Sequence, residues 1–178
     1  MEYALILCFD KDTESYFNSI IKSIANSGAS SYMLATNIPP HITIADFYTK
    51  EINTIVSELD NNITNFAIGD VIWASLGSFI PSVLFASPVM NEYLLNACIN
   101  INNLVKPFAP HCGCGQYLPF QWVPHTTLAF HLNNDSLNKA FNVATQNFTA
   151  VKGKCTRLLL AQCNPFKEIK TWDLTHTQ

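Results

Sequence analysis

Pro40-His41-Ile42-Thr43-Ile44 and, about 84 residues later, Pro124-His125-Thr126-Thr127-Leu128 are two segments of this sequence that share one pattern. Each segment is a proline followed by His-x-Thr and an aliphatic residue. Side chains alternate between the two faces of a β-strand, so the histidine and the threonine of each segment are expected on one face and the aliphatic residue on the other. The sequence therefore predicts two strands that each present an imidazole beside a hydroxyl.

The chain around the two motifs repeats one order of elements. Apolar residues at helical spacing, short apolar runs and Gly or Pro breaks indicate strand, helix, strand, helix and then one long bent strand or two short ones, after which the order starts again. The expected strands are residues 3–9, 41–47, 66–79, 83–86, 125–132, 151–163 and 168–174, and the expected helices are residues 13–25, 51–63, 91–105 and 135–148. Asp10 or Asp12 is expected to cap the first helix, and Asn134 or Asp135 the last one.

This duplication predicts a fold with two lobes. We predict a single domain of the α/β class, of the α+β type, with antiparallel-rich sheets lining a central cleft and helices on the outside. The pseudo-repeat lobes are expected at about residues 1–80 and 81–178. A ligand is expected to bind in the cleft between the lobes.

Two imidazole–hydroxyl pairs that face each other across a cleft suit the hydrolysis of a phosphodiester. A neutral imidazole can take a proton from the attacking water, and an imidazolium can give one to the leaving alkoxide, because the pKa of histidine lies near neutral pH. The hydroxyls can donate hydrogen bonds to the phosphate oxygens, so the chemistry requires no metal and no other cofactor. We therefore interpret His41 and His125 as catalytic and Thr43 and Thr127 as phosphate-binding. The sequence does not separate acid from base; in our working assignment His125 activates the water.

Other interpretations of these motifs stay open. A single His-x-Thr is a weak signal, and each histidine taken alone fits an ordinary half-buried side chain bonded to the backbone. The same fold could also bind a nucleotide without turning it over. A further alternative is a metal-binding loop formed by His111, Cys112 and Cys114, although a structural zinc site takes four ligands and usually a Cys-x₂₋₄-Cys spacing.

The two motifs and the internal duplication resemble the 2H phosphoesterase superfamily, and the chain is similar in size to its bacterial 2′-5′ RNA ligase / RNA 2′,3′-cyclic phosphodiesterase-like branch. The resemblance covers essentially the whole chain. It implies a metal-independent phosphodiesterase that acts on a 2′,3′-cyclic phosphate or a 2′-5′ linkage, with its catalytic pairs at His41 with Thr43 and His125 with Thr127. Several members of that branch place an arginine after a motif, whereas the one arginine of this chain is Arg157. This departure bears on ligase activity and on the binding of long RNA more than on the hydrolytic core, and the sequence leaves hydrolase and ligase open.

The charge of the chain also points to a short ligand. The 178 residues include 10 Lys and Arg and 13 Asp and Glu, for a formal net charge of −3, and the basic residues form no run. Proteins that bind a long phosphate backbone are usually basic. No apolar run approaches the ~18 residues of a membrane-spanning helix. The expected partner is a nucleotide or an RNA terminus, with no membrane and no long nucleic-acid tract.

The cysteines and the first residues of the chain indicate a cytoplasmic protein. Six cysteines in 178 residues are too sparse for a disulfide scaffold, so free thiols are expected. Residues 1–10 lack the basic region of a signal peptide, and the acidic residues Asp10 and Asp12 follow early, so no signal peptide is expected.

Several further side chains are weaker candidates for the cleft. Aromatic rings near the motifs could stack a nucleobase, and the candidates are Tyr117, Trp122 and Phe47. His131 shares a strand face with His125 by alternation. Outside the cleft we expect His176, as a solvated side chain, and Arg157, as a solvated or ion-paired one.

Overall fold

The structure is a computed structural model that describes residues 1–175. His176, which we expected to be solvated, lies outside the described residues. The strands are β1 (Glu2–Phe9), β2 (His41–Tyr48), β3 (Gly69–Phe79), β4 (Val83–Pro88), β5 (Thr126–Ala129), β6 (Val151–Gln162) and β7 (Lys167–Asp173). The helices are α1 (Lys11–Asn26), α2 (Tyr32–Thr36), α3 (Ile52–Asn62), α4 (Glu92–Val105) and α5 (Asn134–Asn147), with a short 3₁₀ turn at Ile63–Asn65.

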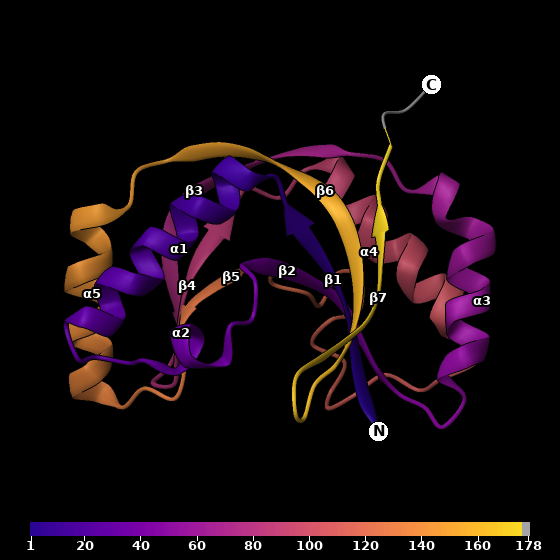
Figure 1. Cartoon of the computed structure of the whole chain (residues 1–178), viewed down its shortest axis with the longest axis horizontal. Helices are drawn as coiled ribbons and strands as arrows, with labels where there is room; N and C mark the ends of the chain where they lie inside the picture. Colours follow the sequence, from indigo (N-terminus) through magenta and orange to yellow (C-terminus); the bar gives the residue numbers. More distant parts are fainter. Residues whose placement is uncertain (176–178) are drawn as a thin grey trace.

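All seven strands form one antiparallel sheet in the order β2-β1-β6-β3-β4-β5, and β7 pairs with β6 outside this path. The long strand β6 joins the two halves of the sheet, because its first residues pair with β3 and its later residues pair with β1. Figure 1 shows β6 arching over the molecule from one half to the other. The predicted α+β class and two-lobed architecture are confirmed, with one bent sheet in place of separate sheets.

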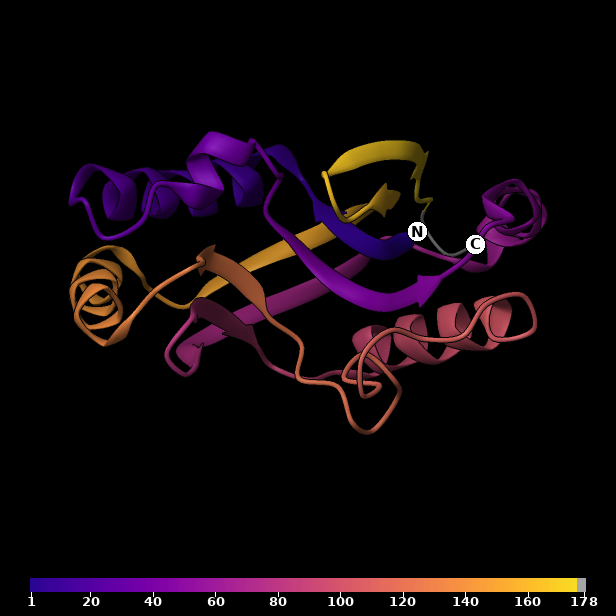
Figure 2. The ribbon, with the colours of Figure 1, turned by 90° about the horizontal axis from the view of Figure 1, so that it is seen from below.

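The helices cover the outside of the two halves in an interleaved way. α1 and α5 pack together over the half that contains β4 and β5, whereas α3 and α4 lie on the half that contains β1 and β2 (Figures 1 and 2). The helix that follows β1 along the chain therefore packs on the half opposite to β1. A boundary between repeat units at about residue 80 stays a prediction.

The aromatic side chains of β1, α1 and β3 meet in the centre of the core. The ring of Trp73 lies 4.9 Å from that of Phe9 and 5.0 Å from that of Phe17, both in edge-to-face arrangements. All three side chains are fully buried. Such contacts add to the hydrophobic gain of burial and fix the helix against the sheet.

Helix caps explain where two of the predicted helices begin. Asp10 Oδ1 accepts a hydrogen bond of 2.9 Å from the backbone N–H of Thr13, which confirms Asp10 as the cap of α1. The prediction for α5 was wrong by a residue or more, because the cap is Asn133, whose Oδ1 accepts from the N–H of Ser136 at 2.9 Å. Ser136 bonds back to Asn133 and completes a capping box.

The structure also differs from the predicted elements at β3, which begins at Gly69 and not at residue 66, at β5 and at α2. β5 ends at Ala129 and not at residue 132, because His131 takes a positive φ of 58°, which a strand cannot contain. The helix α2 was not predicted, since five residues are too few to show a helical period.

Within residues 1–175, no helix has the length and apolar character needed to cross a membrane.

Candidate active site

The first motif lies on β2, at the edge of the sheet. His41 and Thr43 are half-buried, whereas Ile42 and Ile44 are fully buried. The predicted alternation is therefore confirmed: the aliphatic residues enter the core and the two polar residues share the other face. Burial of the two isoleucines prevents the strand from turning about its own axis. His41 and Thr43 are therefore held on the face opposite to the core.

The second motif begins just before β5, at the opposite edge of the sheet. Thr127 is half-buried and Leu128 is fully buried, as the alternation predicts. Thr126 is also fully buried, and its Oγ1 accepts a hydrogen bond of 3.0 Å from Nε1 of Trp73. Thr126, the middle residue of this motif, is therefore fixed to the central core by its hydrogen bond to Trp73. Because strand side chains alternate, His125 and Thr127 on either side of it face away from the core.

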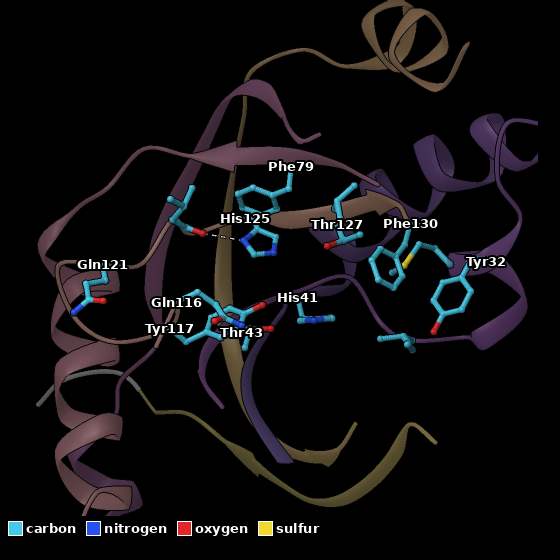
Figure 3. Close-up of a pocket in the computed structure, with 14 residues that line it drawn as sticks. Tyr32, His41, Thr43, Phe79, Gln116, Tyr117, Gln121, His125, Thr127 and Phe130 are labelled. Atoms are coloured by element: carbon cyan, nitrogen blue, oxygen red, sulfur yellow. Dashed lines mark hydrogen bonds between the residues drawn. The ribbon is translucent and has the colours of Figure 1, made fainter. Parts of the chain in front are cut away.

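Both motifs open into one cavity of about 450 Å³, within the size range of small-molecule sites. Figure 3 shows His41 and His125 approaching this cavity from opposite sides, one from each half of the sheet. The wall is mostly apolar and aromatic, and its other polar groups include the two threonines and two glutamines. The lining residues are Tyr32, Met33, Ile38, His41, Thr43, Phe79, Val83, Gln116, Tyr117, Gln121, Val123, His125, Thr127 and Phe130.

The two histidines make equivalent backbone hydrogen bonds. Nδ1 of His41 lies 2.7 Å from the carbonyl oxygen of Pro39, and Nδ1 of His125 lies 2.8 Å from that of Val123. A carbonyl oxygen only accepts, so each Nδ1 carries the hydrogen and donates it. In the neutral ring the other nitrogen, Nε2, is then an acceptor. Each half of the sheet thus supplies an imidazole with the same tautomer, whose Nε2 makes no hydrogen bond to residues 1–175 and can accept a proton.

Burial shifts the pKa of both histidines downward. The pKa of His41 is lowered to about 4, mainly by desolvation; the bond to Pro39 works in the opposite direction, and the neighbouring His125 adds to the lowering. Desolvation also lowers the pKa of His125, against the bond to Val123. Both rings are therefore neutral in the free protein at pH 7. A bound phosphate anion would raise both pKa values, because it favours the charged imidazolium.

Aromatic rings surround His125. Its ring centroid lies 4.9 Å from that of Phe79, at 89°, 5.3 Å from that of Phe85, and 6.3 Å from that of Tyr117. Gly77 makes room for this cluster, because a Cβ at that position would lie 2.5 Å from the Phe85 ring. Sequence reasoning missed Phe85, since only the pairing of β3 with β4 and of β4 with β5 brings it to the histidine.

Of the three candidate base-stacking residues, one lines the cavity and two are buried away from it. Tyr117 lines the cavity, and burial raises its pKa to about 12. Phe47 is fully buried and stacks on Tyr3 at 6.0 Å, and Trp122 is only 7% exposed; neither lines the cavity. A ring buried in the core away from the cavity cannot stack a nucleobase bound there, so the prediction is corrected for Phe47 and Trp122.

Two other sequence candidates lie away from the cavity. His131 follows the end of β5, is exposed, and packs edge-on against Tyr32 at 4.6 Å, outside the lining. Arg157 forms an ion pair with Glu14 and donates a hydrogen bond to the carbonyl of Phe9. The interpretation of Arg157 as an ion-paired side chain is therefore confirmed.

The loop with His111, Cys112 and Cys114 shows no metal-like cluster. Cys112 is buried, whereas His111 and Cys114 are exposed. Within the described part of the chain, no three His, Cys, Asp or Glu side chains are grouped so that they could hold a metal ion. The structure thus gives no support to the metal-loop alternative.

The chain has the same fold as solved structures that match it over nearly its whole length, one of which is described as a phosphoesterase. TT0787 of Thermus thermophilus has a TM-score of 0.66 at 12% identity, over 100% of both chains. LigT of E. coli, complexed with 3′-AMP, has a TM-score of 0.56 at 12% identity, over 98% of both chains. Usb1 of Kluyveromyces marxianus has a TM-score of 0.53 at 10% identity, over 97% of this chain and 98% of that chain. No protein-family model and no curated protein sequence matches the chain.

Proposed function

We propose that the protein is a metal-independent phosphodiesterase that hydrolyses a 2′,3′-cyclic phosphate or a 2′-5′ linkage of a nucleotide or RNA end. One observation carries the proposal. His41 and His125 face one cavity from opposite sides, each with Nδ1 bonded to a backbone carbonyl and each beside a threonine hydroxyl. This arrangement supplies two proton-transfer groups and two hydrogen-bond donors around a space of nucleotide-site size.

The proposed reaction needs one histidine of each kind. The neutral histidine takes a proton from water as the water oxygen bonds to phosphorus. The bond from phosphorus to the 2′ or 3′ oxygen then breaks, and the other histidine, as imidazolium, gives its proton to that oxygen. Thr43 and Thr127 donate hydrogen bonds to the non-bridging oxygens, where negative charge develops.

The environments of the histidines favour the reverse of the working assignment, in which His125 activated the water. His41 has the more strongly lowered pKa, and His125 has a smaller downward shift, so His125 takes up the proton first. We therefore assign His125 as the acid and His41 as the base. A bound phosphodiester anion supports this state, because it attracts the imidazolium.

Complexes of similar structures support a nucleotide ligand. LigT of E. coli has been crystallised with 3′-AMP and with NADP⁺, and Usb1 of K. marxianus has been determined with uridine monophosphate. We propose a ligand of the same chemical class for this cavity. The phosphate would lie between the histidines, and Tyr117 would contact the base.

The second candidate function is nucleotide binding without turnover. The neutral state of both histidines in the free protein favours this alternative, because the acid step needs an imidazolium. Tight binding of a nucleoside phosphate with no hydrolysis would distinguish it from the enzyme.

The proposal is tested by turnover of 2′,3′-cyclic AMP and of a 2′-5′ dinucleotide in excess EDTA. The variants are His41→Ala and His125→Ala, and His131→Ala is the matched control because that histidine is exposed outside the cavity. Loss of a general acid or base lowers kcat by about 10²–10⁴-fold, and we expect this in both cavity variants and not in the control. Phosphorus NMR of the product identifies the ester that remains. Full activity of either cavity variant would overturn the two-histidine mechanism.

A further inference from the structure

Asn102 on α4 links two parts of the cavity wall that are far apart in sequence. Its Nδ2 donates hydrogen bonds to the carbonyl oxygens of Ile44, at 3.0 Å, and of Tyr117, at 3.1 Å. A third acceptor, the carbonyl oxygen of Cys98 one helical turn earlier, lies 2.9 Å away. One half-buried side chain thus joins helix α4, the strand of the first motif and the loop that carries Tyr117.

The carbonyl of Ile44 is available because β2 bulges at this residue. Thr43 pairs with Ile6 and Ala45 pairs with Leu5, so Ile44 between them has no partner on β1. A bulged residue leaves the ladder, and its polar groups need other partners. Asn102 supplies the partner one residue after Thr43, and it therefore holds the strand at the phosphate-binding position.

The carbonyl of Tyr117 belongs to a long connection without strands or helices, between α4 and β5. It accepts hydrogen bonds from Asn102 and from the thiol of Cys98, at 3.5 Å. Both donors come from α4, so the helix holds this loop residue in place. The phenol of Tyr117 lies next to the hydroxyl of Thr43 at the cavity wall (Figure 3).

We propose that Asn102 is a positioning residue that sets the distance between Tyr117 and Thr43, and with it the fit of the nucleotide in the cavity. The proposal rests on the proposed function, and it assigns Asn102 no contact with the substrate. An amide suits the task because it donates two N–H groups from one planar nitrogen. Leucine has a similar volume and no donor, and aspartate would place an acceptor against the backbone carbonyls.

The experiment compares Asn102→Leu and Asn102→Asp with the matched control Asn103→Leu. Asn103 is exposed on the same helix, so its change removes an amide of the same kind away from the two carbonyls. We expect Asn102→Leu to raise KM about tenfold, Asn102→Asp to raise it more, and Asn103→Leu to leave it unchanged. A tenfold change in KM corresponds to about 1.4 kcal/mol.

Hydrogen–deuterium exchange provides a readout that does not depend on activity. In Asn102→Leu, faster exchange is expected in residues 43–45 and in residues 116–121, and not in β6. A melting temperature for each variant shows that it is folded; if the leucine variant does not fold, Asn102→Ser, which keeps one donor, takes its place. Unchanged exchange in both segments would overturn the proposal, whether or not the wild type is active.

A double-mutant cycle separates positioning from general loss of stability. Because Asn102 acts in part through Tyr117, Asn102→Leu is expected to raise KM less in the Tyr117→Ala background than in the wild type, with only its effect on Thr43 left. Additive effects on KM would contradict the proposal. An inactive wild type with the expected exchange pattern would instead reject the proposed function and leave the structural role of Asn102 standing.

Discussion

Trp73 and Thr126 are joined by a buried hydrogen bond, in which Nε1 of the tryptophan donates to the threonine hydroxyl at 3.0 Å. The bond connects the centre of the aromatic core to the middle of the second motif, between His125 and Thr127. The direction in which the motif faces is therefore held by a core residue more than 50 positions earlier in the chain.

Thr126→Val is expected to destabilise the protein by about 1–3 kcal/mol, because it leaves the Trp73 N–H buried without an acceptor. Thermal or urea unfolding measures this loss. Thr171→Val is the matched control, since Thr171 is exposed on a strand and its change is expected to stay within about 0.5 kcal/mol. Equal stability of the Thr126 variant and the wild type would show that the bond contributes little.

The stability of the protein is expected to fall as the pH drops from about 6.5 to about 4. His41 has a pKa of about 4 in the folded chain and an ordinary value of 6.5. The unfolded chain therefore binds a proton in this window that the folded chain does not, and the free energy of unfolding decreases with falling pH. In His41→Gln the decrease should be smaller than in the wild type and in His131→Gln, as measured from melting curves at several pH values across this window. Identical pH dependence in all three proteins would contradict the lowered pKa of His41.

Gly77→Ala is expected to disturb the aromatic cluster around His125. The added methyl group would meet the Phe85 ring at 2.5 Å, so the ring must move away from its contacts with Phe79 and His125. Overpacking of this kind costs about 1–3 kcal/mol. We expect a lower melting temperature together with reduced turnover.

Ser75→Ala is the matched control for Gly77→Ala, because Ser75 is an exposed residue of the same strand. Chemical shifts of the His125 ring protons report the displaced aromatic ring directly. A Gly77 variant with unchanged His125 shifts and unchanged stability would contradict the packing argument.

Removal of metal ions is expected to change neither stability nor turnover. The protein can be melted before and after dialysis against EDTA, with and without added zinc. Cys114→Ser should behave as the wild type, because Cys114 is exposed and its side chain does not contribute to the core. The opposite outcome is one zinc ion bound per chain and a melting temperature that falls on chelation. It would support a metal site in the loop of His111, Cys112 and Cys114.

Periodicity and alternation in the sequence were enough to predict most of the elements and the facing of the motif side chains. In β2 the aliphatic residues are buried and His41 and Thr43 share the other face, because neighbouring side chains of a strand must point in opposite directions. Asp10 as the cap of α1 followed from a local rule in the same way. These properties depend on residues a few positions apart, so the sequence determines them by itself.

Properties that depend on distant contacts were decided by the tertiary structure. Hydrophobicity alone could not place Trp122 and Phe47 inside the core and Tyr117 at the cavity, because aromatic residues occur in both settings. Nor does any local signal lead from the motifs to Phe85 or Asn102, which reach them through strand pairing and helix packing. The sequence by itself determined two outward-facing His–Thr pairs; the closing of the sheet around β6 brought both pairs to one cavity, because a long-range arrangement is the outcome of packing the whole core.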